Sequence, residues 1–221
     1  MQTVIRSDYS DTTVKIARWL LKVLKWDCVG ERPTCKQAVI TTYPHVANMD
    51  LFYALMSAFA LRIPVVYMMK KEWFFWPLGP IFKWLGGIPI DRSRSNNVVD
   101  QMIKWFDAHE TLYVICPPEG TRKNVKYWKM GFYFIAVGAK VPVLPAFCDY
   151  YNRRSGVTEP IEMTGDLKVD YENIKSHYVK EVGRCGEIDP KYFEKDAIMV
   201  KPREPRRDNA MNAPTGSGSP A

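Results

Sequence analysis

The stretch QAVITTYPHVANMDLFYALMSAFALRIPVVYMM, residues 37–69, decides the fold. Residues 37–43 and 64–69 are short runs rich in apolar and β-branched residues, which is typical of buried strands. Residues 49–61, between them, form a longer apolar run of the length expected for a helix. A strand, a helix and a second strand in this order predict an α/β domain.

The same alternation continues towards the C-terminus. It predicts strands at 86–90, 111–116 and 141–147, helices at 96–108, 131–139 and 170–182, and a turn between late strands at 150–157. Short strands that alternate with helices predict a mixed, mostly parallel sheet flanked by helices. Folds of this class place their functional residues in the loops beyond the strand ends.

Residues 12–26, TTVKIARWLLKVLKW, predict an amphipathic helix before the alternating region. Its basic residues recur at steps of three and four, and apolar residues fill the other side. The basic face holds Lys15, Arg18, Lys22 and Lys25, and the apolar face holds Ile16, Trp19, Leu20, Val23 and Leu24. Such a helix is typical of the lipid interface. The alternative is that its apolar face packs on the domain, and both can hold in part.

The 221 residues carry a net charge of +7, which favours an anionic partner: nucleic acid, acidic lipid or a phosphorylated substrate. No helix-turn-helix, RNA-binding or zinc-finger pattern occurs, so we do not expect nucleic acid. The first apolar stretch is interrupted by charges, unlike a signal peptide. The longest uncharged apolar run, residues 51–61, is shorter than the roughly 18 residues of a membrane span. We therefore expect a protein that lies on a membrane surface without crossing it.

The five cysteines have no C-x-x-C spacing, so the sequence indicates neither a zinc site nor a disulfide framework. This cysteine usage fits a reducing compartment. Residues 201–221 are polar and rich in proline, glycine and serine, and we expect them to be disordered.

Four motifs stand at or after predicted strands: HVANMD (45–50), GGIPIDRSR (86–94), PPEGTR (117–122) and VPVLPAF (141–147). His45 and Asp50 are five residues apart, which is not a helix-face spacing, so their side chains can meet only if the backbone turns between them. Taken alone, the pair favours a capping turn over a base and its orienting carboxylate.

In this order, the motifs resemble the glycerolipid acyltransferase family, whose members include lysophosphatidic acid acyltransferases. The H-x-x-x-x-D motif of the family stands as 45–50 and its E-G-T-R motif as 119–122. The stretches KKEW with IPIDR, and VPVLP, match its other two motifs, and the resemblance covers about residues 37–165. Pro44 and Ala47 stand where many members have asparagine and serine, and Trp73 replaces a leucine, which leaves the acceptor open.

The resemblance implies an O-acyltransferase without a cofactor, whose acyl donor is acyl-CoA or an acyl carrier protein. His45 would be the general base and Asp50 would hold its ring in the productive tautomer. Acceptor binding is assigned to Glu119, Gly120, Thr121 and Arg122, with neighbouring phosphate contacts from Lys70 and Arg92. Structural alternatives stay open: an ion pair for Arg92 or for Glu119, and a solvated position for Lys70. No second ligand joins His45 at metal-binding spacing, so we expect no metal.

The expected reaction is transfer of a fatty acyl chain to a lysophospholipid, most simply 1-acylglycerol-3-phosphate to phosphatidic acid, in phospholipid biosynthesis. We expect a peripheral membrane protein on the cytoplasmic face. A non-catalytic lipid-binding protein and an acyltransferase for another lyso-lipid are the alternatives, and the oligomeric state is open. The expected parts are a membrane-surface helix at 1–30, an acyltransferase domain at 31–200 and the tail at 201–221. Residues 72–87, which hold three tryptophans, are interpreted as a bent element that lines an acyl tunnel or dips into lipid, with core packing as the alternative.

Overall fold

The computed structural model describes residues 8–44, 49–90, 95–120, 126–190 and 192. Its elements are α1 (Asp11–Val23), β1 (Asp27–Val29), β2 (Gln37–Tyr43), α2 (Met49–Ala60), β3 (Val65–Lys70), the 3-10 helix η1 (Lys71–Trp73), α3 (Leu78–Trp84), β4 (Gly87–Ile90), α4 (Ser95–Ala108), β5 (Leu112–Ile115), β6 (Tyr127–Trp128), α5 (Gly131–Ala139), β7 (Val143–Asp149), β8 (Arg154–Val157), α6 (Leu167–Val182) and β9 (Glu187–Ile188). The tail predicted at 201–221 lies outside the described residues.

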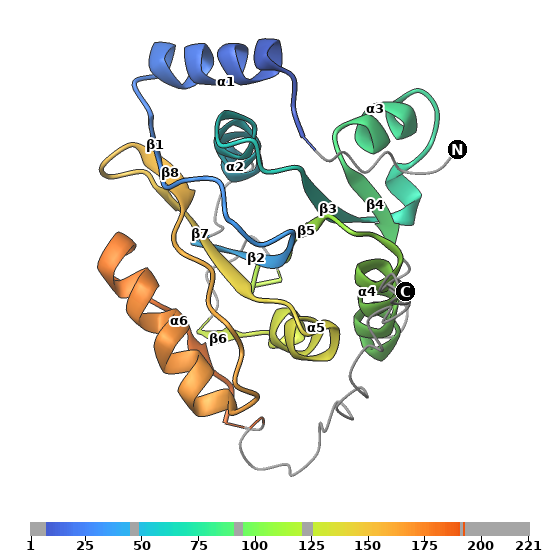
Figure 1. Cartoon of the computed structure of the whole chain (residues 1–221), viewed down its shortest axis with the longest axis vertical. Coiled ribbons are helices and arrows are strands. Elements are labelled where there is room, and N and C mark those ends of the chain that lie inside the picture. The colour runs from blue at the N-terminus through green and yellow to red at the C-terminus, as the bar shows by residue number, and fades with distance from the viewer. Residues whose placement is uncertain (1–7, 45–48, 91–94, 121–125, 191, 193–221) are drawn as a thin grey trace, which may run out of the picture.

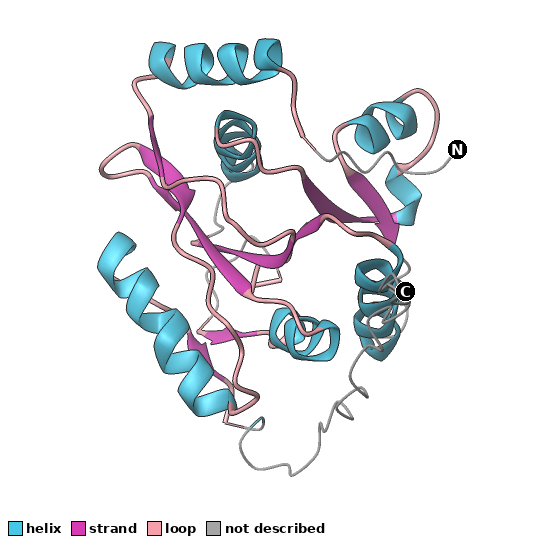
Figure 2. Cartoon of the chain, in the orientation of Figure 1, coloured by secondary structure: helices cyan, strands magenta, loops and turns pink. Residues whose placement is uncertain are grey.

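The main sheet has seven strands in the order β1-β8-β7-β2-β5-β3-β4. Every neighbouring pair is parallel except β7 with β8, which is antiparallel. Strands β6 and β9 form a separate two-stranded parallel sheet. Figure 2 shows how helices alternate with the strands along the chain. The prediction of a mixed, mostly parallel sheet flanked by helices is confirmed.

Alternate residues of the central strands face two hydrophobic clusters, one on each side of the sheet. In β2, Ala38 and Ile40 belong to the cluster between the sheet and helices α1 and α2. Val39 and Tyr43 belong to the cluster between the sheet and helices α4, α5 and α6. This is the period of two of a strand that is covered on both faces. Figure 1 shows the three layers, with α1 and α2 above the sheet and α4, α5 and α6 below it.

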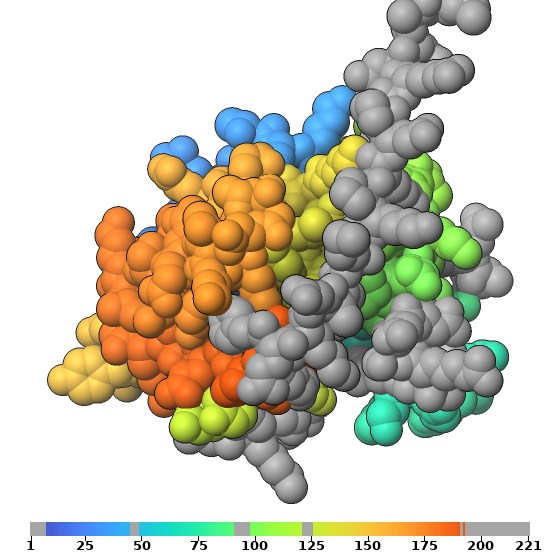
Figure 3. All heavy atoms as spheres, turned by 90° about the horizontal axis from the view of Figure 1, so that it is seen from below, coloured from blue at the N-terminus to red at the C-terminus, as the bar shows by residue number. Residues whose placement is uncertain are grey.

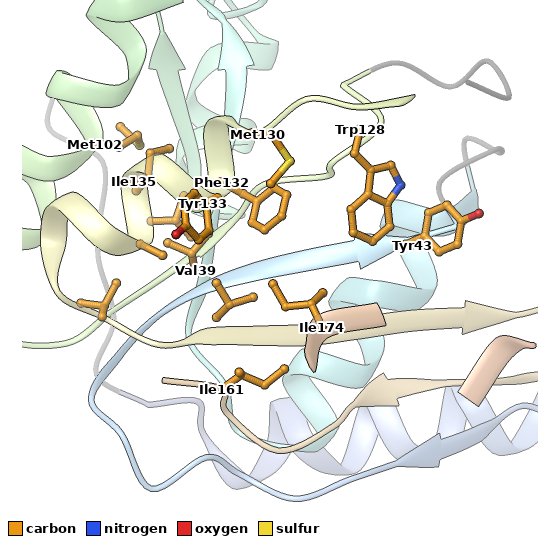
Figure 4. Packing of buried hydrophobic residues seen from close by; sticks show 14 of the residues in the cluster. Val39, Tyr43, Met102, Trp128, Met130, Phe132, Tyr133, Ile135, Ile161 and Ile174 are labelled. Atoms are coloured by element: carbon orange, nitrogen blue, oxygen red, sulfur yellow. The ribbon is translucent and has the colours of Figure 1, made fainter. Parts of the chain in front are cut away.

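The cluster on the side of α4, α5 and α6 packs residues of α5 against β2. Figure 4 shows Phe132, Tyr133 and Ile135 of α5 near Val39 of β2, all of them buried. Seen from below, the outer surface of this layer is formed by α6 and the chain before it on one side and by α4 on the other (Figure 3). This core fixes the position of β2, after which the H-x-x-x-x-D motif begins.

Helix α1 packs on α2 through one narrow stripe. Val14, Ala17 and Leu21 are buried, and a guanidinium nitrogen of Arg18 donates a hydrogen bond to the carbonyl oxygen of Ala60, 3.2 Å away. Ile16, Trp19, Val23 and Leu24, which make up most of the predicted apolar face, are exposed. The packing of α1 on the domain is thereby confirmed for this stripe, and contact of the exposed face with lipid stays a prediction. Among the described helices, none combines the length and apolar character that crossing a bilayer requires.

Strands β1 and β4 form the two edges of the main sheet. Gly156 in β8 lies so close to β1 that a Cβ atom there would stand 1.8 Å from the carbonyl oxygen of Val29. Only glycine permits this approach. At the other edge, β4 contains Pro89, which has no amide hydrogen to donate.

The sequence pattern does not predict β1, β6, β8 or β9. These strands have two to four residues. β1, β6 and β9 pair with segments that are distant in the sequence, and β8 pairs both with the distant β1 and, across the turn, with β7. Of the turn predicted at 150–157, residues 150–153 form the turn and the remainder is β8. Strands this short form because of the segments they pair with, so their own residues show too little alternation to predict them.

Candidate active site

The carboxyl ends of the parallel strands face the same edge of the sheet. Tyr43, the last residue of β2, pairs with Phe147 near the end of β7, and the last residues of β3 and β4, Lys70 and Ile90, pair with each other. Because β5 runs parallel to both β2 and β3, the loops after all these strands open at the same edge. The predicted motifs begin in these loops, so the topology gathers them on one side of the molecule.

Asp50 lies in the first turn of α2, directly beyond the segment that follows β2. Its side chain is fully buried, and its Oδ1 atom accepts a hydrogen bond from the hydroxyl of Tyr150, 2.5 Å away. A carboxylate in the first turn also benefits from the partial positive charge of the helix N-terminus. Because Asp50 is buried and bonded to Tyr150, its carboxylate is held in place.

Tyr150 is the first residue after β7, and its ring is held by two aromatic neighbours. The rings of Trp26 and Tyr53 are stacked with centroids 3.8 Å apart. Tyr150 meets both edge-on, at 5.2 Å from Trp26 and 5.9 Å from Tyr53. The indole nitrogen of Trp26 donates to the hydroxyl of Ser155, 2.7 Å away. The short segment after α1 is thereby fixed against the strand that follows Tyr150.

The thiol of Cys148 lies beside this pair and is fully protonated at neutral pH. Burial, and after it the negative charge of Asp50, raise the pKa of Cys148 to about 12. A thiol in this state is a poor nucleophile, because the thiolate is the reactive form. Cys148 therefore fits a structural role beside Asp50 and Tyr150.

The loop after β5 turns sharply at Gly120, which has φ of +61°. A Cβ atom at Gly120 would stand 2.7 Å from the Cδ atom and 3.1 Å from the Nζ atom of Lys129. The glycine thus permits both the backbone conformation and the close approach of a lysine ammonium group. The neighbouring Glu119 side chain is buried.

A second cation lies near the end of β2, on the side of α6. The guanidinium carbon of Arg184 is 5.9 Å from the ring centroid of Tyr43. Burial raises the pKa of Tyr43, Arg184 lowers it, and Glu119 raises it, so both charges act on this hydroxyl. Figure 4 shows the Tyr43 ring beside Trp128, with centroids 5.2 Å apart. A pocket of about 470 Å³ opens here and is lined in part by Pro44, Tyr150 and Arg184.

The structure describes half of the predicted site residues. Asp50, Glu119 and Gly120 lie at the edge of the sheet beside β2 and β5. Lys70 is exposed at the end of β3, two strands from β2 and so roughly 10 Å along the edge. His45, Arg92, Thr121 and Arg122 lie outside the described residues. Within the described part of the chain, no three histidine, cysteine, aspartate or glutamate side chains are grouped as metal ligands.

A family model described as "Acyltransferase" matches residues 15–149, more than half of the chain. The protein belongs to the acyltransferase family. The matched residues of this acyltransferase run from α1 to the end of β7 and include Asp50, Lys70, Glu119 and Gly120. The resemblance based on the four motifs is thereby confirmed at the level of the family.

This acyltransferase is similar to a curated protein and to a solved structure. It is 34% identical over 101 residues to the 1-acyl-sn-glycerol-3-phosphate acyltransferase beta of Homo sapiens, a match that covers 40% of this chain and 36% of that protein. The chain thus spans about a third of the length of that curated relative. Its fold is similar to the crystal structure of the 1-acyl-sn-glycerophosphate (LPA) acyltransferase PlsC from Thermotoga maritima. That match has a TM-score of 0.55 and 19% identity, and it covers 80% of each chain.

Three residues at this edge of the acyltransferase are not predicted by the motifs. Tyr150 follows the predicted strand 141–147, and a polar residue at the carboxyl end of a parallel strand is a signal that could have indicated it. Lys129 and Arg184 reach the site from segments beyond the four motifs. Only the three-dimensional arrangement brings them there.

Proposed function

We propose that the protein transfers a fatty acyl chain from an acyl thioester to the hydroxyl group of a lysophospholipid. The simplest acceptor is 1-acylglycerol-3-phosphate, the product being phosphatidic acid in phospholipid biosynthesis. The observation that carries this proposal is the fully buried Asp50 of the H-x-x-x-x-D motif, in a chain of the acyltransferase family. The substrate named for the human relative supports the choice of acceptor.

In the proposed mechanism, the neutral imidazole of His45 removes the proton of the acceptor hydroxyl while its oxygen attacks the thioester carbonyl carbon. The tetrahedral intermediate collapses, the carbon–sulfur bond breaks, and the departing thiolate takes the proton from the imidazolium. Asp50 orients the ring and stabilises the imidazolium. The products are the ester and the free thiol, and no residue of the protein is acylated.

We propose that the loops carrying the E-G-T-R motif, Lys70 and Arg92 bind the acceptor and its phosphate group. We propose that Glu119, Gly120, Thr121 and Arg122 bind the acceptor and that Lys70 and Arg92 add phosphate contacts. The sharp turn at Gly120 supports this, because it brings backbone and the Lys129 ammonium group together. An arginine guanidinium can bind a phosphate at two points.

The test is a thiol-release assay on purified protein, with acyl-CoA and acyl carrier protein as donors. The acceptors are lysophosphatidate, a choline lysophospholipid, an ethanolamine lysophospholipid and none. We expect release that depends on an acceptor and is fastest with lysophosphatidate. Vesicle binding without turnover on any acceptor would identify a non-catalytic lipid-binding protein. Turnover with only another lysolipid would show that the proposed acceptor is wrong and would leave the proposed mechanism standing.

We also propose that the protein binds the cytoplasmic face of a membrane as a peripheral protein. Large apolar side chains on α1, η1 and α3 and in the segment between η1 and α3 are exposed. Trp76 of that segment is at 84% and Trp19 of α1 at 61% of full accessibility. Figure 1 shows α1 and α3 at the same end of the molecule. Lys15, Lys22 and Lys25 are exposed on or next to α1, which adds attraction to anionic lipids.

Replacing Trp19 or Trp76 by alanine should weaken binding to anionic vesicles roughly tenfold for each residue, because about 1.4 kcal/mol of apolar burial is lost. Sedimentation with vesicles of increasing anionic content measures the effect. The matched control is Val179→Ala, which truncates an exposed apolar side chain on α6, in the opposite layer. Equal pelleting of all three variants and the unmodified protein would contradict the proposed membrane surface.

A further inference from the structure

The hydrogen bond from Tyr150 to Asp50 joins two elements that are 100 residues apart in the sequence. Its donor lies at the carboxyl end of β7, and its acceptor is the motif carboxylate at the start of α2. The distance of 2.5 Å is at the short end of the range for a hydroxyl that donates to a charged oxygen. The bond therefore constrains the orientation of the carboxylate that the proposed mechanism uses.

The Tyr150 ring is positioned independently of this hydrogen bond. Trp26 and Tyr53 contact it edge-on, and Trp26 is itself held by Ser155. A phenylalanine at this position would keep these ring contacts, so the hydroxyl can be removed alone. This makes the contribution of the hydrogen bond measurable.

The hydroxyl is a donor throughout the physiological range. Burial, followed by the hydrogen bond to Asp50, raises the pKa of Tyr150. The other described groups that act on this hydroxyl or its neighbours are Cys148 and Asp149 of β7 and Tyr53 of α2. Asp149 is paired with Arg154 at 3.2 Å. Asp50 therefore receives its hydrogen bond from a neutral, permanently protonated group.

We propose that Tyr150 is a positioning residue that fixes the Asp50 carboxylate and thereby sets the proton affinity of the His45 imidazole. This inference rests on the proposed function, in which Asp50 and His45 form the base. The hydroxyl disperses part of the carboxylate charge and holds one oxygen in place. In the proposed mechanism, the carboxylate held in this way stabilises the imidazolium during transfer.

The sign of the effect follows from electrostatics. Without the Tyr150 hydroxyl, the negative charge of Asp50 is more concentrated, and the protonated imidazole is stabilised. The pKa of His45 should therefore rise in Tyr150→Phe, and the neutral, basic form becomes scarcer at acid pH. The acid limb of the kcat/KM profile should move to higher pH by roughly half a unit, which is about a threefold change in proton affinity.

The kinetic experiment compares Tyr150→Phe with Tyr133→Phe. The Tyr133 hydroxyl donates to the buried carboxylate of Asp170, 3.1 Å away, so the control loses the same kind of bond in a purely structural position. We expect Tyr150→Phe to lower kcat roughly tenfold, through loss of orientation, with little change in KM. The control should lose stability and keep the pH profile of the unmodified protein.

The second readout does not require activity. The chain has three histidines, so labelled imidazoles give three NMR titration curves, and His45→Ala identifies the curve of His45. We expect this curve alone to shift upward in Tyr150→Phe. An unchanged His45 curve, or the same shift in Tyr133→Phe, overturns the inference. If the unmodified protein is inactive on every acceptor, the proposed function fails while the NMR titration still decides the role of Tyr150.

Discussion

Replacing His45 by alanine should slow acyl transfer roughly a hundred- to ten-thousandfold, the range that general base catalysis typically contributes. The variant lacks the group that takes the acceptor proton in the proposed mechanism. Asp50 is fully buried and engaged with Tyr150, and the Cys148 thiol is protonated. The measurement is kcat for thiol release with the best acceptor, at saturating donor.

His177→Ala is the matched control, because this histidine lies on α6, outside the proposed machinery. Both variants should show the circular dichroism spectrum and vesicle binding of the unmodified protein. Asp50→Asn should also lose most activity, because an amide can hold the imidazole in the wrong tautomer. Near-normal turnover by His45→Ala, in a folded protein, would show that the proposed base is wrong.

Replacing Asp170 by asparagine should lower the free energy of unfolding by about 3 to 5 kcal/mol. The Asp170 side chain is 1% exposed and accepts four hydrogen bonds. Its Oδ1 atom receives the backbone N–H and the hydroxyl of Thr164, and its Oδ2 atom receives the hydroxyl of Tyr133 and the backbone N–H of Gly165. An asparagine would place an NH₂ group against two of these donors, which would remain buried without an acceptor.

Thermal denaturation checks this prediction, with an expected drop in Tm of roughly 10 °C for a chain of this size. The control is Glu172→Gln in the same helix, which removes only a solvent-exposed ion pair with Lys175 and should have little measurable effect. Equal stability of Asp170→Asn and the unmodified protein would mean that the four hydrogen bonds do not anchor α6. This anchor matters for the site, since α6 leads directly to Arg184.

The elements with strong local patterns were predictable from the sequence. The observed bounds of β2 and α5 equal the predicted ones, because continuous apolar runs of these lengths identify buried elements. The edge strand β1 was not predictable, since its pairing with β8 depends on the absence of a side chain at Gly156. In α1, the pattern did not show that Val14, Ala17 and Leu21 form the packed stripe.

The candidate site was predictable only in part, for a similar reason. The H-x-x-x-x-D and E-G-T-R motifs identified Asp50 and the loop at Gly120, because these residues are close in the sequence to their own motif partners. Tyr150 was not predicted to contact Asp50, as nothing local to either residue indicates a contact across 100 positions. The position of Lys129 beside Gly120 was not predicted, because Lys129 belongs to none of the four motifs.

The two edge strands of the main sheet bear on strand pairing between copies of the protein. An unpaired strand edge is a template for another chain, and long, flat edges promote association. Here β1 has three residues, and β4 has four with Pro89 among them. An incoming strand would therefore find few consecutive donors and acceptors at either end. Both edges of the sheet therefore disfavour the addition of a strand from another molecule.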